Sequence, residues 1–338
     1  MTLELNHRIN LFDEQELASP ISRMGLGFRK SIKPEILAKG GRILFRNSGN
    51  GLLKVTNQES VPPGIMVAAP SNGITGIRYS KGTSNAAAMV SNTAGKIFES
   101  FLDDTALREN LSTEYFAVTS KALIVNSATW SEIAFDSFCS ALPNVQNKKD
   151  FVSRFLGYGK IQPEKILQCT DKRVTLIGYG SLRPEEAYIY DLPLPEAISG
   201  TTNWRKLAVT LAWFSPINTE NQLYRTHKLW FDFPNNGIDA KLKAKRSFYD
   251  DDMVKRGTVQ HEIFFSDKAQ AFPDNSNLSI KVNCKTDALR YDSVSFKESK
   301  NVKAIKYALI VTLEIDPKIQ IDVYNNILSR IKALVRAT

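Results

Sequence analysis

Cysteine and histidine are scarce in this chain. Its 338 residues contain three of each, and no pair of cysteines shows the Cys-x-x-Cys spacing of many metal sites. The cysteines are Cys139, Cys169 and Cys284, and the histidines are His7, His227 and His261. An odd, widely spaced set of cysteines argues against a disulfide framework, and so few ligands argue against a zinc site. We therefore expect a reducing compartment, no metal and no other cofactor.

Long apolar runs are also missing. The longest, such as Tyr307–Leu313, fall far short of the ~18 residues that a transmembrane helix requires. The segment from Met1 to Asp13 carries charged residues and asparagine where a signal peptide needs an apolar stretch. These two absences predict a cytoplasmic protein without a membrane partner.

Charge is not strongly one-sided. Lysine plus arginine number 44 and aspartate plus glutamate 35, which leaves a formal net charge of +9. Apolar residues make up 43% and charged residues 23%, values that are typical of globular proteins and exclude a disordered one. We interpret the basic excess, including the cluster Lys241–Arg246, as solvated surface, with contact to an acidic partner as the alternative. A nucleic-acid partner is not favoured, because clustered cations with interleaved aromatics are absent.

The chain changes character near residue 171. Before it, apolar periodicity predicts helices over Asn85–Leu102 and Thr113–Ala128, a short helix over Pro163–Cys169 and a buried strand over Ile65–Ala69. After it, seven β-rich runs separated by turn residues predict an antiparallel sandwich, and Asp322–Val335 predicts a closing amphipathic helix. The seven runs are Arg173–Ile177, Ala187–Leu192, Lys206–Trp213, His227–Phe233, Thr258–Ser266, Leu278–Cys284 and Ile305–Ile315. We therefore expect an α/β domain over 1–171 and a β-sandwich-like domain over 172–338.

Two features of the second half have competing interpretations. Its aromatic side chains favour a sandwich core, with a carbohydrate- or peptide-binding face as the alternative; they are Trp204, Trp213, Trp230, Phe214, Phe231, Phe233, Phe264 and Phe265. The three consecutive carboxylates of Asp250–Asp252 lack the spacing of a calcium loop, so we interpret them as solvated rather than as metal ligands.

The segment Gly82-Thr83-Ser84-Asn85 carries the sharpest chemical signal. Ser84 follows a glycine and stands where the predicted helix begins. The start of a helix presents unpaired N–H groups, which stabilise an oxyanion that develops beside a nucleophilic hydroxyl. The alternative is that the Thr-Ser pair simply caps the helix.

The order of four motifs resembles the subtilisin-like serine peptidases. Gly82-Thr83-Ser84 is similar to the family's nucleophile motif, and Ser19–Gly25 with Ile32–Gly40 resembles its "SPFSSRG…KPDIxAPG" stretch. Lys121–Ala128 resembles its "KALLVHSA" helix, and Gly157-Tyr158-Gly159 its "GyG" turn. The resemblance implies the C-terminal part of a parallel-sheet subtilase domain in residues 1–171, with Ser84 as nucleophile.

One subgroup of that family is more similar than the rest. Asn85 after the serine, and Ala88 where most subtilases have proline, resemble large bacterial subtilases that are often encoded beside an AAA-type ATPase. Blocks such as Val209–Pro216 and Tyr307–Glu314 resemble the β-rich C-terminal region of that subgroup. The resemblance therefore covers most of the chain and implies an AAA-type ATPase as a possible partner.

The rest of the catalytic machinery is not recognisable. Subtilases place their Asp and His before the Ser, but the surroundings of His7 do not resemble the family's histidine motif, and the oxyanion asparagine segment is also lacking. Three explanations stay open: the missing groups belong to an upstream segment or another chain, the domain is a non-catalytic remnant that binds a partner, or His227 or His261 serves as a new base. The first predicts a serine endopeptidase that is inactive as this isolated chain, and the second an interaction module.

Overall fold

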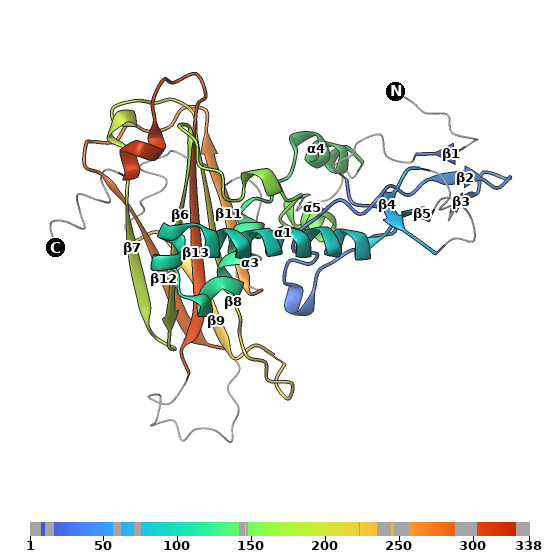
Figure 1. Cartoon of the computed structure of the whole chain (residues 1–338), viewed down its shortest axis with the longest axis horizontal. Helices are drawn as coiled ribbons and strands as arrows, with labels where there is room; N and C mark the ends of the chain where they lie inside the picture. The colour runs from blue at the N-terminus through green and yellow to red at the C-terminus, as the bar shows by residue number, and fades with distance from the viewer. Residues whose placement is uncertain are drawn as a thin grey trace. The chain divides into compact units, whose positions relative to one another are not determined.

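The computed structural model describes residues 8–10, 17–56, 62–70, 76–141, 146, 148–222, 224–234, 245–246, 257–287 and 303–328 (Figure 1). Contacts within the chain divide it into two compact units. Unit 1 comprises Met1–Gly27, Lys33–Lys96 and Ala128–Ile161, and unit 2 comprises Phe28–Ile32, Ile97–Ser127 and Gln162–Thr338. The units alternate along the chain, whereas the domain boundary at residue 171 stays a prediction.

Unit 1 contains short strands and short helices. Its elements are β1 (Arg8–Ile9), β2 (Phe45–Asn47), β3 (Leu53–Val55), β4 (Ile65–Ala68), β5 (Ile77–Ser80), α4 (Glu132–Ala141), α5 (Lys148–Leu156) and the first part of α1 (Thr83–Asp103). The strands form an antiparallel sheet in the order β1-β2-β3 and a separate antiparallel pair, β4-β5. Strand β5 leads directly into α1 through the turn at Lys81 and Gly82.

The parallel sheet that the family resemblance implies is not visible in the described residues. Parallel pairing there is limited to an isolated bridge between Leu37 and Lys160. The strand expected at Ile65–Ala69 is present as β4, but its side chains alternate between half-buried and exposed instead of being buried. The reason is that β4 pairs with β5 alone, and an isolated two-stranded sheet buries little of its side-chain surface.

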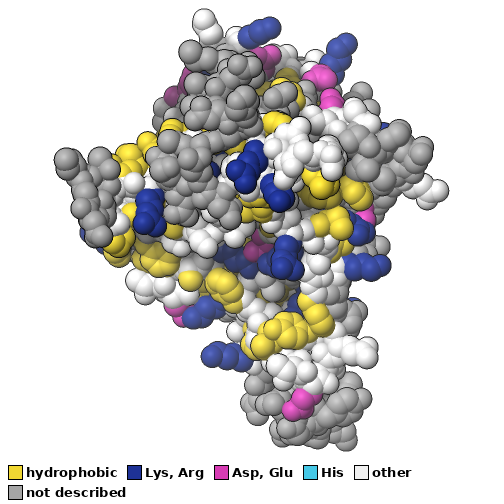
Figure 2. Space-filling view, turned by 90° about the vertical axis from the view of Figure 1, so that its right-hand side faces the viewer, with side chains coloured by type: hydrophobic (Ala, Val, Ile, Leu, Met, Phe, Trp, Pro, Cys, Tyr) yellow, Lys and Arg dark blue, Asp and Glu magenta, His cyan; other side chains and the backbone are white. Residues whose placement is uncertain are grey.

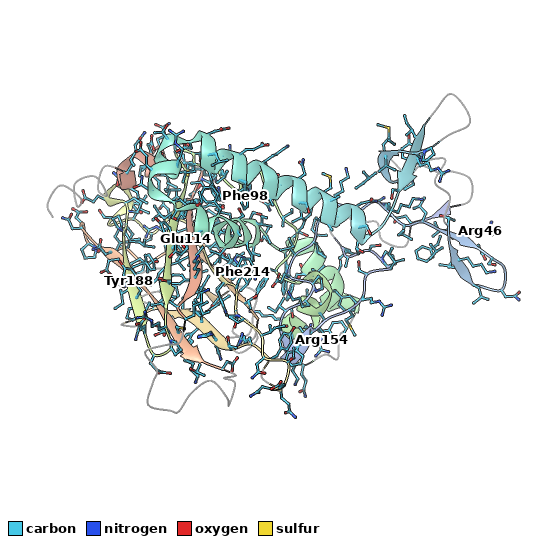
Figure 3. All side chains as sticks on the ribbon, turned by 60° about the horizontal axis from the view of Figure 1, so that its bottom comes forward. Arg46, Phe98, Glu114, Arg154, Tyr188 and Phe214 are labelled. Atoms are coloured by element: carbon cyan, nitrogen blue, oxygen red, sulfur yellow. The ribbon has the colours of Figure 1, made fainter. Side chains whose placement is uncertain are left out.

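Helix α1 confirms the predicted helix over Asn85–Leu102 and is slightly longer. Its apolar stripe is only partly buried, since Ile97 and Phe101 are buried whereas Met89 remains 47% exposed. The buried end packs through aromatic rings within unit 2, where Phe101 and Phe116 lie 4.9 Å apart; Phe98 projects from the same part of α1 (Figure 3). Asp104 then caps the short helix α2 (Thr105–Asn110), because its carboxylate accepts from the Leu107 N–H at 2.9 Å.

All seven predicted strands of the second half are present in unit 2. They are β6 (Arg173–Leu182), β7 (Ala187–Pro193), β8 (Arg205–Trp213), β9 (His227–Asp232), β11 (Val259–Ser266), β12 (Asn277–Thr286) and β13 (Ile305–Ile315), to which β10 (Lys245–Arg246) adds a short edge. A five-stranded sheet has the order β10-β11-β8-β13-β6, and a three-stranded sheet has the order β7-β12-β9. Every pairing in both sheets is antiparallel.

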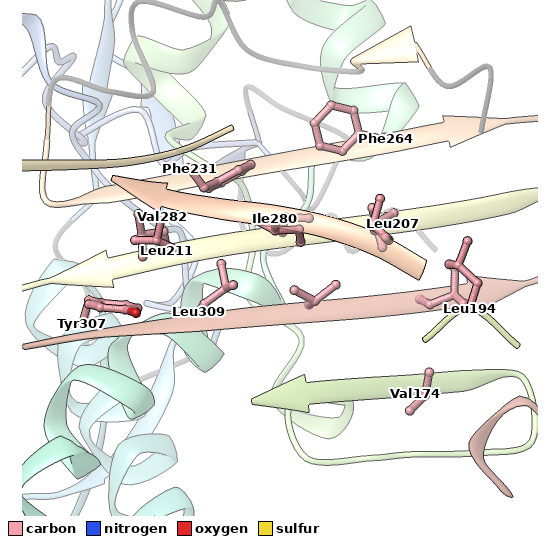
Figure 4. Packing of buried hydrophobic residues seen from close by; sticks show 14 of the residues in the cluster. Val174, Leu194, Leu207, Leu211, Phe231, Phe264, Ile280, Val282, Tyr307 and Leu309 are labelled. Carbon is pink, nitrogen blue, oxygen red and sulfur yellow. The ribbon is translucent and has the colours of Figure 1, made fainter. Parts of the chain in front are cut away.

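The two sheets enclose the hydrophobic core of unit 2 (Figure 4). Leu211 of β8 and Leu309 of β13 meet Ile280 and Val282 of β12 in this core, and all four are at most 1% exposed. Helix α3 (Phe116–Asn126), which follows the 3-10 turn η2 (Thr113–Tyr115), packs against β8 and β13. Strand β8 is therefore buried along almost its whole length rather than on alternate residues.

A chain of buried polar groups joins α3 to the five-stranded sheet. The Asn126 amide donates to the Thr210 hydroxyl at 3.0 Å and accepts from the Thr312 hydroxyl at 2.7 Å. Thr210 also hydrogen-bonds His261 Nδ1 at 2.7 Å, and Thr312 hydrogen-bonds Thr175 at 3.0 Å. Four strands and one helix thus share a single hydrogen-bond network.

Three sequence predictions are modified by the structure. The helix predicted over Pro163–Cys169 is only the 3-10 turn η3 (Pro163–Lys165), because Pro163 starts a turn that does not continue. Residues 323–328 of the predicted final helix are helical, with Val323 and Ile327 buried, while its remainder lies outside the described residues. Of the aromatic set, Phe214 is 54% exposed because it follows the last residue of β8.

Several other predictions fall where the structure gives no description. Asp250–Asp252 and the first part of Lys241–Arg246 lie outside the described residues. Among the residues that are described, no helix has both the length and the apolar character needed to cross a membrane. No group of three or more His, Cys, Asp or Glu side chains in that same part of the chain is arranged to hold a metal ion.

Candidate active site at the start of helix α1

Ser84 lies in the first turn of α1, where the sequence predicted it. Gly82 precedes the helix with φ +147°, a backbone conformation that favours glycine. Ser84 is exposed to solvent, and its hydroxyl has no hydrogen-bond partner among the described residues. Thr83 and Ser84 are both inside the helix, so Ser84 does not act as the cap. An exposed hydroxyl therefore stands in the first turn of a helix, where the N–H groups of Asn85 and Ala86 donate to the Gly82 carbonyl oxygen at 3.2 and 3.5 Å.

Gly40 and Gly41 lie directly against the turn that precedes Ser84. The Gly40 carbonyl oxygen accepts from the Gly82 N–H at 2.8 Å. A Cβ atom on Gly40 would approach the Gly82 carbonyl oxygen to 2.6 Å, and one on Gly41 would approach the Ser80 carbonyl oxygen to 2.9 Å. Side chains at both positions are therefore excluded by close backbone approach. This explains the glycine that ends the Ile32–Gly40 motif and the glycine that follows it.

Asn85 adds a side-chain connection that the sequence did not reveal. Its Nδ2 donates to the Gly40 carbonyl oxygen at 3.4 Å and to Ser80 Oγ at 3.0 Å. Ser80 is the last residue of β5, so Asn85 ties the end of a strand, the turn and a distant segment together. Asn85 was noted in the sequence because an asparagine after the serine resembles one subgroup of the family. The order of residues alone does not indicate that its side chain contacts Ser80 or Gly40.

The Gly157-Tyr158-Gly159 turn contacts the other end of the Ile32–Gly40 segment. The Leu37 N–H donates to the Gly159 carbonyl oxygen, and the Tyr158 N–H donates to the Glu35 carbonyl oxygen, each at 2.8 Å. Gly157 and Gly159 have φ of +58° and +113°, and a Cβ on Gly157 would lie 2.0 Å from the Pro34 carbonyl oxygen. Three of the motif segments thus form one continuous set of contacts that ends at Ser84.

The remaining two motif segments, Ser19–Gly25 and Lys121–Ala128, are also part of the described structure. The Gly25 N–H of the Ser19–Gly25 motif donates to the Arg154 carbonyl oxygen of α5 at 2.7 Å. Lys121–Ala128 forms most of the buried helix α3 and the residues just after it, and α3 belongs to unit 2. Four of the five quoted segments therefore belong mainly to unit 1, together with Ser84.

The described part of unit 1 contains no histidine to act as the base for Ser84. His7 lies outside the described residues, and the other two histidines are in strands of unit 2. His227 in β9 is buried, its Nδ1 lies 2.7 Å from Thr226 Oγ1, and burial lowers its pKa. His261 in β11 is 0% exposed and hydrogen-bonds Thr210. Both side chains are thus built into the sandwich interior, as ordinary structural histidines are.

One cavity of unit 2 is well defined and does not include Ser84. It has a volume of about 390 Å³ and is lined by Lys172, Arg173, Trp204, Glu314, Ile315, Asp316 and Pro317. Its two cations are paired, with Arg173 Nε 3.3 Å from Glu314 Oε1 and Lys172 Nζ 2.5 Å from Asp171 Oδ2, and Asp316 Oδ1 accepts from the Lys318 N–H at 2.9 Å. Both cations that line the cavity therefore already have a carboxylate partner.

Comparison with known proteins finds a family likeness in the same part of the chain that holds the motifs. The model of the subtilase family matches residues 9–159. A curated relative, an uncharacterized protein from Sinorhizobium fredii, is 24% identical over 309 residues, which cover 88% of this chain. The match spans 62% of that relative's length, so the relative is considerably longer than the matched region.

Among the solved structures that match is an acidic stable capsid structure of the Helicobacter pylori bacteriophage KHP30. It is 12% identical, and the match covers 41% of this chain and 94% of that chain with a TM-score of 0.16. So low a score carries no argument about fold. The family match covers all five motif segments, and this part of the chain is therefore similar to the subtilase family of serine peptidases.

Proposed function

We propose that this chain supplies the nucleophile of a subtilisin-type serine endopeptidase. The hydroxyl of Ser84 attacks the scissile carbonyl while a base takes its proton, and the leaving amine then receives that proton. Water hydrolyses the resulting acyl-enzyme and frees the serine. The backbone N–H of Ser84 contributes part of the oxyanion hole. The base, its orienting acid and the oxyanion asparagine come from polypeptide outside the described residues.

One observation supports this proposal above all others. Ser84 presents an exposed hydroxyl at the first turn of α1, and Gly40 of another family motif is required by the contact that holds the turn before it. A serine that merely capped the helix would use its hydroxyl on a backbone N–H of the first turn. The hydroxyl of Ser84 has no such partner among the described residues.

The surface of unit 1 favours a partner polypeptide. Leu52, Met66 and Ile133 are 65%, 63% and 59% exposed. One face of the molecule shows hydrophobic side chains among lysines and arginines (Figure 2). Exposed apolar side chains that lie next to one another mark interaction surfaces. We propose that the partner is the segment or chain that carries the histidine and aspartate, and that an AAA-type ATPase is a further partner of the β-rich unit.

Reconstitution tests the catalytic proposal. The full chain is expressed alone and together with the products of its neighbouring coding regions, and cleavage of a denatured protein substrate is measured. We expect no cleavage by the chain alone, cleavage by the assembly, and loss of that cleavage in Ser84→Ala but not in the matched variant Ser91→Ala. Cleavage that survives in Ser84→Ala contradicts the assignment.

The alternative is a non-catalytic interaction module. It is favoured by the lack of a histidine in the described part of unit 1 and by the exposed apolar side chains. In that case the assembly forms but does not cleave, and Ser84→Ala binds the partner as the unchanged chain does. Size-exclusion chromatography of the chain alone adds a second criterion, since a compact monomer that unfolds sharply would contradict the need for a partner.

A further inference from the structure

The side chain of Asn85 closes a small ring of hydrogen bonds around the residues that carry Ser84. On one side it reaches Ser80 Oγ at the end of β5, with Nδ2 at 3.0 Å and Oδ1 at 3.2 Å. On the other side its Nδ2 reaches the carbonyl oxygen of Gly40 at 3.4 Å. Gly40 also accepts the N–H of Gly82, so one carbonyl group holds residues on both sides of Ser84.

This arrangement restricts the backbone where the nucleophile stands. Gly82 is fixed before Ser84 and Asn85 after it, which leaves little freedom in the dihedral angles between them. A helix terminus without such attachments frays, and its N–H groups lose their common direction. A catalytic side chain must be held within about 0.5 Å of its productive position, so the support around it matters as much as the group itself.

We propose that Asn85, together with Ser80, is a positioning residue for Ser84. Asn85 does not serve as the oxyanion donor, because its amide is occupied by Gly40 and Ser80. Its effect passes through the orientation of the first turn of α1, which carries both the hydroxyl and the backbone N–H of Ser84. The inference rests on the proposed function only in naming that hydroxyl as the nucleophile.

A cysteine placed at the site gives a test that needs no base. In a Ser84→Cys background, the rate of alkylation by iodoacetamide is measured as a function of pH, because N–H groups at a helix start lower the pKa of a thiol. Trypsin releases the site in the peptide Gly82–Lys96, which mass spectrometry separates from the peptides of Cys139, Cys169 and Cys284.

Adding Asn85→Ala should raise the apparent pKa of the introduced thiol and slow its alkylation at pH 7 by about five-fold. Ser80→Ala should act in the same direction, and Ser80→Thr, which keeps the hydroxyl, should restore the profile. Asn92→Ala removes an exposed asparagine from the same helix and serves as the matched control. Profiles of Asn85→Ala and Asn92→Ala that coincide would overturn the proposal.

A second substitution guards against loss of folding. Asn85→Asp keeps the shape of the side chain but places a carboxylate beside the site, which should raise the thiol pKa above that of the Asn85→Ala protein. An unchanged profile in this variant, with helical content preserved by circular dichroism, also overturns the proposal. If alkylation shifts as expected but the assembled protein never cleaves a substrate, the positioning role stands and the peptidase proposal fails.

Discussion

The carbonyl oxygen of Gly40 accepts a hydrogen bond of 2.8 Å from the backbone N–H of Gly82, two residues before Ser84. This bond joins segments 42 residues apart in sequence (82 − 40) and brings the end of one family motif against the start of another. It requires a glycine at position 40, since a Cβ there would lie 2.6 Å from the Gly82 carbonyl oxygen. The candidate site therefore depends on backbone contacts more than on side-chain packing.

Gly40→Ala should destabilise unit 1 and displace the turn before Ser84. The added methyl group meets backbone rather than a flexible side chain, and we expect a loss of roughly 2 kcal/mol in the free energy of unfolding, measured by urea denaturation. Gly95→Ala is the matched control, because a Cβ at this position in α1 meets nothing within 4 Å. That control should be stabilising by about 0.5–1 kcal/mol. Equal effects of the two substitutions would argue against the close contact at Gly40.

Asn126→Ala should destabilise unit 2 by about 2 kcal/mol, because it removes the shared partner of two buried hydroxyls, Thr210 and Thr312. The measurement is the urea midpoint of the sandwich transition followed by tryptophan fluorescence, since Trp213 is fully buried in the core. The exposed Asn92→Ala should leave that midpoint unchanged. A stable Asn126→Ala protein would show that the network between α3 and the sheet is dispensable.

Unit 2 should lose stability as the pH falls through the range of histidine titration. Burial lowers the pKa of His227 below its ordinary value of 6.5, and its Nε2 is buried without a partner. The folded state therefore binds a proton less readily than the unfolded state, so the free energy of unfolding decreases below about pH 6.5. His227→Gln should show a smaller decrease between pH 7 and pH 5. A decrease of equal size in the variant would assign the effect to other groups.

Cys284 should resist alkylation in the folded protein. Burial, with the nearby carboxylates of Glu186 and Glu185, raises the pKa of its thiol to about 12. At pH 8, iodoacetamide should therefore modify the half-buried Cys139 and Cys169 first, and Cys284 only after denaturation. Peptide mass spectrometry measures the order, and early modification of Cys284 would mean that the sandwich opens locally around β12.

The sequence predicted the β-rich half better than the helical half. Strand β13 was predicted with its observed bounds, because turn residues frame a long β-branched run. Helices α4 and α5 were missed, since each is short and depends on local contacts such as the Ser131 hydroxyl at the Ala134 N–H and the pairing of Asp150 with Arg154. Apolar periodicity also overstated the burial of α1, because periodicity records a stripe but not whether another element covers it.

At the candidate site, the sequence located Ser84 at a helix start but not what holds it there. The glycine before the helix and the serine inside it are local features, and both are observed. The roles of Ser80, Asn85 and Gly40 depend on contacts across a strand, a turn and a distant loop. A linear pattern does not contain such contacts, so these residues emerged only from the three-dimensional arrangement.

Covalent labelling by a fluorophosphonate probe shows whether Ser84 acts as a nucleophile. The probe is added to cells or lysates in which the full chain is expressed with its neighbouring coding regions, and the modified tryptic peptide is identified. We expect phosphonylation of the peptide Gly82–Lys96 at Ser84, retained in Ser91→Ala and lost in Ser84→Ala. Modification of a different serine, or labelling that persists in Ser84→Ala, would contradict it.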